Sequence, residues 1–351
     1  DTFGSGNNTV SLVLGTENFV AGQLYTIKAW TSNPNGMADT VNFNDTSTVV
    51  VSPGLAGTYT IGGATPDYPT FTAALADLHT FGVCDSVPFN VRNGTYNEQL
   101  EFLSVAGAGA NSPIVFQSES GDSTQVILSF FNNSSSTNYT LLLNGVDWLT
   151  LRGMTLEASG TSFSRVISMI GGVNHLRLEN NVIRSSSTTS TSTNRSLVYF
   201  TNNTVNEFLH FHRNVFQNGS GGLYFNGPTN NNNYLAGLEV LDNEFVDQYS
   251  YGLYLVYHTG ALIDGNRFEV GGNYTVYRGI HLFRNYGAPQ ITNNQMYLPF
   301  GYRGILLDEV FGSVAEPVLV ANNYVAVDGT STSYGIYSED GTYQNIFHNT
   351  V

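Results

Sequence analysis

The chain has 351 residues, of which only 11% are charged and 13% are aromatic, and its formal net charge is −15. This charge excludes nucleic acid and anionic membranes as partners, because their phosphates would be repelled. The single lysine, Lys28, and the wealth of Gly, Asn, Ser and Thr indicate an all-β chain. No apolar run is long enough to span a membrane. Cys84 has no second cysteine to pair with, and we expect it to be a small buried apolar residue.

Residues 1–52 alternate apolar and polar side chains in three runs, at 11–14, 23–30 and 47–51. Turn-forming residues separate these runs at 33–36 and 42–45. Such a pattern is typical of the last strands of an immunoglobulin-like β-sandwich, although a complete domain needs about 100 residues. We therefore assign 1–52 to the C-terminal strands of a β-sandwich, with further strands upstream, or to a small cap.

Residues 53–110 contain the one helix that the sequence predicts. A strand at 57–63 precedes it, and Phe71, Ala74, Leu75 and Leu78 then follow the i, i+3, i+4, i+7 spacing of a helix face over 71–80. Thr70 is the expected N-cap and Gly82 the expected end. A strand–turn–strand unit follows at 87–100. We interpret 53–110 as a junction and a cap for the repeats beyond it.

The rest of the chain, 111–351, is a repeat of short alternating strands. Each repeat carries one marked Asn, and the successive Asn residues are 23–33 positions apart: Asn181, Asn214, Asn243, Asn266, Asn294, Asn323 and Asn349. An irregular period of this size is typical of a β-solenoid. Its coils stack about 4.8 Å apart, so these Asn side chains are expected to hydrogen-bond from coil to coil as a ladder. We also expect them to adopt the left-handed corner conformation, with Gly153 in the equivalent place one coil earlier.

A second strand series interleaves with the first and can be aligned on Gly222, Gly252, Gly279, Gly304 and Gly335. Together with a short third strand, it predicts a triangular coil. Polar insertions at 185–193 and 230–233 are expected to leave the coil as mobile loops. Because the chain stops within a repeat at Val351, we expect coils to continue beyond it.

The cap region resembles a known family. Gly62-Gly63, the helix start Tyr68-Pro69-Thr70-Phe71 and the segment Gly94-Thr95-Tyr96-Asn97-Glu98 are similar to the N-terminal cap of right-handed parallel β-helix proteins of the pectin-lyase-like superfamily. The sequence of this cap region is most similar to that of large secreted surface proteins of Bacteroidetes. This resemblance implies an extracellular or cell-surface location and further domains in the same polypeptide. It also implies export by the type IX route, with Asp39-Thr40-Val41 as a candidate glycosylation site.

Known β-helix enzymes build their sites on one exposed sheet face. In the second strand series, alternation places Leu223, Leu253, Ile280, Ile305 and Ile336 inside and Tyr224, Tyr254, His281, Leu306 and Tyr337 outside. Stacked Tyr rings suit sugar rings, and Arg suits hydroxyls or uronic carboxylates. The glycan-binding candidates are therefore Tyr224, Tyr251, Tyr254, His281, Arg278, Arg303, Tyr334 and Tyr337. The alternative is a solvated face on which the Tyr rows merely stabilise the sheet.

Acidic residues on adjacent coils extend this candidate face, flanked by Arg284 and His258: Asp308, Glu309, Glu339 and Asp340. Two carboxylates roughly 5 Å apart would suit a retaining glycosidase, which makes Asp308, Glu339, Arg278 and Arg303 the catalytic candidates. The same four acids are also candidate Ca²⁺ ligands, the one cofactor considered. His210 and His212 share a strand face, but we interpret that face as structural rather than metal-binding.

Enzyme motifs expected for this fold are missing. The polygalacturonase-like Asn-Thr-Asp, Asp-Asp, Gly-His-Gly and Arg-x-Lys motifs do not occur, nor do the signatures of pectin esterases and pectate lyases beyond the cap. The sequence therefore favours a non-catalytic structural or adhesive segment of an extracellular surface protein or fibre, binding polysaccharide or other surface proteins. The alternative is a polysaccharide lyase or glycoside hydrolase acting on an acidic or neutral polysaccharide.

Overall fold

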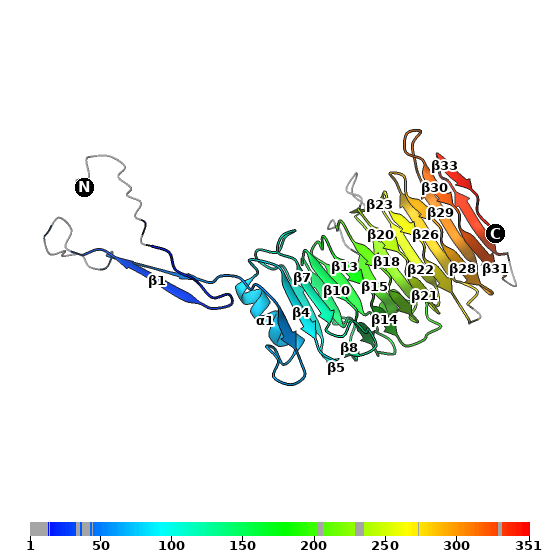
Figure 1. Cartoon of the computed structure of the whole chain (residues 1–351). Coiled ribbons are helices and arrows are strands. Elements are labelled where there is room, and N and C mark those ends of the chain that lie inside the picture. Colours follow the sequence, from blue (N-terminus) through cyan, green and yellow to red (C-terminus); the bar gives the residue numbers. More distant parts are fainter. Residues whose placement is uncertain are drawn as a thin grey trace.

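The computed structural model describes residues 13, 15–32, 36, 43, 45–201, 206–228, 235–272, 274–328 and 332–351. Within these residues the chain forms a parallel β-helix that runs from a capping helix at one end to the last strand at the other (Figure 1). Three parallel sheets form the sides of each coil, as the two strand series and the short third strand predicted.

The strands of each sheet stack in register from coil to coil. Sheet 1 contains β6 (Leu100–Leu103), β9 (Leu141–Asn144), β12 (Ile167–Ile170), β15 (Ser196–Thr201), β18 (Gly221–Asn226), β22 (Tyr251–Val256), β26 (Arg278–Asn285), β29 (Arg303–Val310) and β32 (Tyr334–Glu339). Sheet 2 contains β3 (Tyr59–Ile61), β4 (Val87–Val91), β7 (Ile114–Ser118), β10 (Leu149–Arg152), β13 (Arg177–Glu179), β16 (His210–His212), β20 (Glu239–Leu241), β24 (Leu262–Asp264), β27 (Gln290–Thr292), β30 (Val318–Ala321) and β33 (Gln344–Phe347). Sheet 3 contains β5 (Gly94–Asn97), β8 (Val126–Phe130), β11 (Thr155–Ala158), β14 (Val182–Ser185), β17 (Val215–Gln217), β21 (Glu244–Val246), β25 (Arg267–Glu269), β28 (Gln295–Leu298) and β31 (Tyr324–Val327). A small pair, β19 (Leu235–Ala236) and β23 (His258–Thr259), lies beside them.

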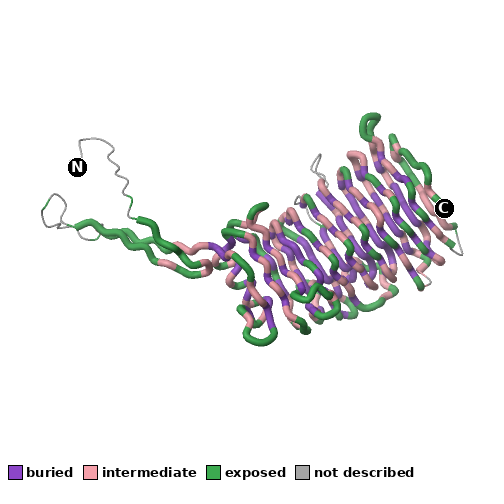
Figure 2. Tube along the Cα trace, in the orientation of Figure 1, coloured by how far each residue is buried: buried purple, intermediate pink, exposed green. Residues whose placement is uncertain are grey.

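Alternating side chains fill the interior of the solenoid. In sheet 2 the inward column is fully buried: Phe211, Val240, Ile263, Ile291 and Val320. In sheet 3 the rings of Phe216, Phe245 and Phe268 stack with centroids 4.7 Å apart at each step. Buried and exposed positions therefore alternate along the strands, as Figure 2 shows, and the outward positions are left free for other roles.

The seven marked Asn residues form a hydrogen-bonded column at the corner between sheets 2 and 3. The backbone N–H of Asn243, for example, donates to Asn266 Oδ1 (2.9 Å), and its Nδ2 donates to the same oxygen (3.0 Å) and to the carbonyl of Phe211 (2.7 Å). The pattern repeats from Asn181 to Asn349 and begins with the N–H of Met154, which donates to Asn181 Oδ1 (3.0 Å). Each coil therefore satisfies the buried polar groups of the previous one.

The left-handed corner conformation belongs to the residue before each ladder Asn, so that part of the prediction was wrong. The residues with positive φ are Asn180, Arg213, Asp242, Gly265, Asn293, Asn322 and His348. Gly153, with φ 63°, is equivalent to Asn180, and Met154 takes the ladder position in that coil. The physical reason is that the ladder Asn must point inward to reach two coils, while the residue before it makes the turn.

The predicted helix is α1 (Phe71–Phe81), which covers the first coil at the N-terminal end of the solenoid (Figure 1). Thr70 caps it by accepting from the N–H of Ala73 (3.1 Å), and Gly82 ends it with φ 68°. Glu98 accepts two further N–H groups of the first turn, from Phe71 (3.1 Å) and Thr72 (2.8 Å). Beyond Gly82, Val83 takes the core position and Cys84 is exposed, so the prediction of a buried cysteine was wrong.

Before the cap, β1 (Tyr25–Trp30) and β2 (Thr46–Val51) pair as an antiparallel ribbon that extends away from the solenoid (Figure 1). Its side chains are largely exposed, and Trp30 keeps 68% of its surface accessible. The assignment to a β-sandwich stays a prediction. At least half of each run or turn expected at 11–14, 33–36 and 42–45 lies outside the described residues, as do the whole segment Asp39–Val41 and the whole loop at 230–233. No helix in the described part of the chain has the length and apolar character to cross a bilayer.

Candidate functional site

The outer face of sheet 1 carries the aromatic column that the Gly alignment predicted. Strand register places Tyr199, Tyr224, Tyr254, His281, Leu306 and Tyr337 on successive coils. The Tyr199 and Tyr224 ring centroids are 5.4 Å apart and those of Tyr224 and Tyr254 are 5.1 Å apart, both stacked. His281 meets Tyr254 edge-on at 4.7 Å. Leu306 is buried and interrupts the column between His281 and Tyr337.

Tyr251, one of the predicted glycan-binding residues, is a core residue. The register pairs it with Gly221, whose missing side chain leaves the space that the Tyr251 ring occupies. Only 6% of Tyr251 is exposed, its phenol lies 2.5 Å from Ser196 Oγ, and burial raises its pKa. Tyr251 is two residues before the inward-facing Leu253, and side chains two residues apart in a strand point to the same face. Strict alternation would therefore have placed Tyr251 inside.

Arg278 and Arg303 lie side by side in register on β26 and β29, half-buried beside the aromatic column. The Arg303 guanidinium carbon lies 4.6 Å from the Tyr302 ring centroid and 4.4 Å from that of Tyr337. The Nε atoms of both arginines are buried without a hydrogen-bond partner among the described residues. Burial, followed by the neighbouring charge of Arg303, lowers the pKa of Arg278.

These two arginines differ from most others in the chain. Of the 11 arginines, seven lie within 4.0 Å of a carboxylate oxygen: Arg92, Arg152, Arg177, Arg184, Arg213, Arg267 and Arg284. Arg165, Arg195, Arg278 and Arg303 have no such partner among the described residues. Arg195 is instead bonded to backbone carbonyls, including those of Ser186 (3.1 Å) and Ser187 (3.2 Å). Arg165 lies on Tyr199 and donates to the Thr193 carbonyl (3.0 Å).

A pocket of about 320 Å³ opens between these groups. It is lined by Thr191, Thr193, Tyr224, Ser250, Tyr251, Tyr254, Arg278 and His281. Its threonine wall comes from the polar segment 185–193, which was expected to project from the coil. Arg195 holds the start of that segment by the carbonyl bonds described above, so the segment folds back beside the Tyr column. The pocket therefore combines three tyrosine rings, an imidazole, hydroxyl groups and one guanidinium.

The carboxylates lie further along the same face. Asp308 and Glu339 are direct register partners on β29 and β32, as the sequence alignment placed them. Burial, and next the charge of Glu339, raises the pKa of Asp308. His281 Nε2 lies 3.8 Å from Asp308 Oδ2, and burial together with the charges of Arg278 and Arg303 lowers the pKa of His281 to about 3. His281 is therefore neutral near pH 7.

The four predicted Ca²⁺ ligands are not brought together as one ligand set. Both oxygens of Glu309 are engaged by Arg284, at 2.9 and 3.2 Å. A metal ion held by side chains needs several His, Cys, Asp or Glu ligand atoms close together. Among the described residues, one group of at least three such residues has all its ligand atoms within 4.8 Å of one another, and it contains neither Asp308 nor Glu339. His258, expected to flank the face, is fully enclosed, and burial lowers its pKa to about 3.

The group that does converge is His210, His212 and Glu239 on sheet 2. The sequence interpretation treated the two histidines as structural and did not include Glu239. A signal was present, because His210 precedes Asn214 by four residues and Glu239 precedes Asn243 by four. Aligning the repeats on the ladder Asn therefore places His210 and Glu239 in direct register, which the structure shows.

Comparisons with known proteins establish the fold. No protein-family model matches the sequence, and no curated protein is significantly similar to it. Among solved structures, the chain resembles the deglycosylated pectin methylesterase from Aspergillus niger with a TM-score of 0.51 and 13% identity, over 86% of this chain and 93% of that one. PemA, the pectin methylesterase from Erwinia chrysanthemi, aligns with a TM-score of 0.46 and 8% identity, over 84% of this chain and 94% of that one. The likeness to the Aspergillus niger protein shows the fold, a right-handed parallel β-helix.

Proposed function

We propose that this protein acts on an acidic polysaccharide, held along the outer face of sheet 1. The observation that carries the proposal is the pair Arg278 and Arg303. In a chain with 27 acidic and 12 basic residues, most arginines find a carboxylate, yet these two lie half-buried beside open aromatic rings without one. A half-buried guanidinium without a carboxylate partner is costly to keep charged, so an anionic ligand would stabilise both arginines.

The chemistry of the pocket specifies a sugar acid. A guanidinium binds a carboxylate through two parallel hydrogen bonds, and the Tyr224 and Tyr254 rings, whose faces stack on their neighbours, can offer ring edges and phenol hydroxyls to a sugar. Thr191 and Thr193 add hydroxyl groups at the rim. Uronic acids combine a carboxylate, hydroxyls and an apolar ring face. Arg303 on the next coil places a second guanidinium in register with Arg278, which suits a linear polymer better than a single small molecule.

The structural comparison supports a polysaccharide as the substrate class. The Aspergillus niger protein of similar fold is a pectin methylesterase, and this likeness favours a polysaccharide-acting protein over a purely structural segment. We place the protein outside the cell or at its surface for the same reason. Its membership of a large Bacteroidetes surface protein, with other surface proteins as partners and export by the type IX route, rests on the sequence resemblance.

A binding test isolates Arg278 and Arg303. Polygalacturonate should bind the parent chain more tightly than its methyl ester or a neutral glucan does. In the Arg278→Gln/Arg303→Gln double variant we expect affinity to fall at least tenfold, because a hydrogen bond to a charged group contributes about 1.5–3 kcal/mol. Arg267→Gln is the matched control, since Arg267 is an exposed residue on sheet 3. Equal binding by parent and double variant would refute the proposal.

Hydrolysis is the second candidate, favoured by the adjacent pair Asp308 and Glu339. A carboxyl group with a raised pKa can donate a proton while a neighbouring exposed carboxylate acts as base or nucleophile. The assay measures new reducing ends, released methanol and unsaturated products from polygalacturonate and its methyl ester, for the parent and for Asp308→Asn. Activity lost in Asp308→Asn supports this role. If the parent binds but forms no product, hydrolysis is rejected while binding stands.

A further inference from the structure

We propose that His210, His212 and Glu239 form a binding site for a divalent transition-metal ion of the Zn²⁺ type on the outer face of sheet 2. The site is independent of the face proposed to hold polysaccharide, because it lies on a different sheet of the coil.

The fold itself brings the three side chains together. His210 and His212 are two positions apart on β16, so both point outward while Phe211 between them fills the core. Parallel register places Glu239 of β20 directly beside His210. Two neighbouring strands of one sheet therefore hold all three residues, which makes the arrangement stiffer than one built on loops.

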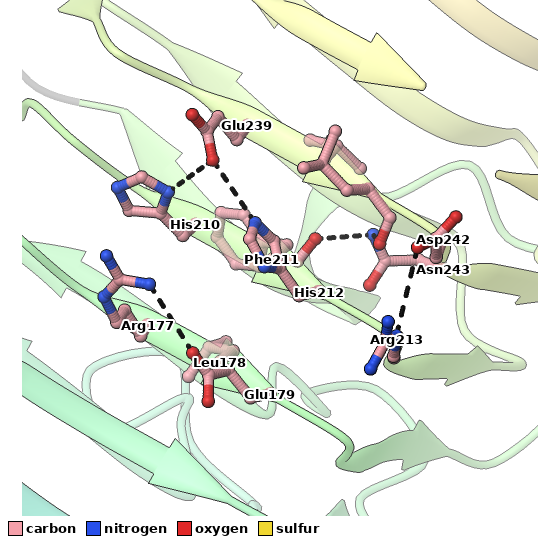
Figure 3. Close-up of polar contacts among 12 residues, drawn as sticks. Arg177, Leu178, Glu179, His210, Phe211, His212, Arg213, Glu239, Asp242 and Asn243 are labelled. Atoms are coloured by element: carbon pink, nitrogen blue, oxygen red, sulfur yellow. Dashed lines mark hydrogen bonds and ion pairs between the residues drawn. The ribbon is translucent and has the colours of Figure 1, made fainter. Parts of the chain in front are cut away.

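The ligand atoms already converge on one point. Glu239 Oε2 lies 2.7 Å from His210 Nδ1 and 3.3 Å from His212 Nε2, and Figure 3 shows both rings directed at this carboxylate. Nitrogen and oxygen ligands lie about 2.0–2.2 Å from Zn²⁺, which in a tetrahedron separates them by roughly 3.3 Å. Only small side-chain rotations would be needed to place an ion among the three atoms.

The surrounding charges leave the three residues available. Arg177, the register neighbour of His210 on the preceding coil, directs its guanidinium at Glu179 (3.6 Å) rather than at Glu239. Carboxylates are ordinarily ionised near neutral pH, so Glu239 can supply an anionic ligand.

The donor set selects the metal. Two imidazoles and one carboxylate suit Zn²⁺ and its first-row neighbours, whereas Ca²⁺ and Mg²⁺ prefer oxygen ligands alone. Three protein ligands leave at least one coordination position open. A pocket of about 350 Å³ adjoins His212 and is lined also by Glu179, Asn180, Arg213, Leu241 and Asp242. Water or an oxygen atom of a bound molecule can reach the ion from that side.

Calorimetric titration of the chelator-treated full chain with ZnCl₂ tests the site. We expect one ion per chain, and at least tenfold weaker binding in each of His210→Gln, His212→Gln and Glu239→Gln, because even outer-shell changes cost about 10–100-fold. Glu239→Gln is the sharpest variant, since it keeps a hydrogen-bond acceptor for the imidazoles but removes the charge. His348→Asn, a change to an exposed histidine far along the solenoid, is the control and should bind like the parent.

Two readouts separate metal binding from a merely structural histidine–glutamate contact. Melting temperatures without metal should be similar for parent and Glu239→Gln, while added Zn²⁺ should raise only that of the parent. Co²⁺ should give visible absorption bands in the parent that are absent from the His210→Gln/His212→Gln double variant. A parent that binds no stoichiometric Zn²⁺, or a Glu239→Gln variant that binds it equally well, would overturn the proposal.

Discussion

Replacing Asn266 by Leu should break the ladder at one rung with little change in side-chain volume. Asn266 is fully buried and bonds to both neighbouring coils. Its Oδ1 accepts from the N–H of Asn243 (2.9 Å) and from Asn243 Nδ2 (3.0 Å). Its Nδ2 donates to the carbonyl of Val240 (2.7 Å) and to Asn294 Oδ1 (2.9 Å). A leucine of similar shape can make none of these bonds.

The expected cost follows from the groups left behind. The Asn243 N–H becomes an unsatisfied buried donor, which costs about 1–3 kcal/mol, and the bonds to Val240 and Asn294 are worth about 1 kcal/mol each. The free energy of unfolding should therefore fall by about 3–5 kcal/mol. Because coils contact only their neighbours, the loss should be concentrated at the interface between the coils of Asn243 and Asn266.

Guanidinium denaturation followed by circular dichroism measures the total, and amide hydrogen exchange at Asn243 locates it. Asn345→Leu is the control, because Asn345 is exposed on β33 and its loss should change stability by no more than about 0.5 kcal/mol. If Asn266→Leu is as stable as this control, or if the Asn243 amide stays protected, the ladder does not hold the coils together.

Three further changes test other parts of the fold. Thr70→Ala removes the cap of α1 and should lower the free energy of unfolding by about 1 kcal/mol in thermal denaturation. Tyr251→Phe should also cost about 1 kcal/mol, through the lost bond to Ser196. Burial holds the pKa of His258 at about 3, below the unfolded value of about 6.5, so the unfolded chain binds the extra proton and stability is lost as pH falls from 6.5 towards 3. His258→Phe should flatten the stability–pH curve there by up to about 1.4 kcal/mol per pH unit, measured by denaturation at several pH values.

The repeat in the sequence was sufficient to predict the solenoid, its ladder and the register of sheet 1. A fixed residue in every coil defines register, and register in a parallel stack decides which side chains become neighbours. For this reason the pairs Tyr224–Tyr254, Arg278–Arg303 and Asp308–Glu339 could be predicted without a structure.

Burial at the strand starts could not be predicted in the same way. Tyr251 is buried because Gly221 leaves room for its ring, whereas Arg278, in the same column, is only half-buried. The position of a residue in a register column is therefore not enough to predict its burial. The length of its side chain and the neighbour on the adjacent coil also decide how far it is buried. The failed Ca²⁺ grouping has a similar cause, because Arg284 had already engaged Glu309.

The same separation of roles explains how one scaffold can carry two unrelated sites. Inward positions and the ladder Asn determine stability, and every coil needs them. Outward positions contribute little to the core, so their side chains can vary from coil to coil at small cost. Functional groups should then be found where outward residues of adjacent coils complement one another chemically. Tyr224 and Tyr254 on sheet 1 meet this criterion, and so do His210 and Glu239 on sheet 2. A search for function in such a chain is therefore best made column by column, using the ladder to set the register.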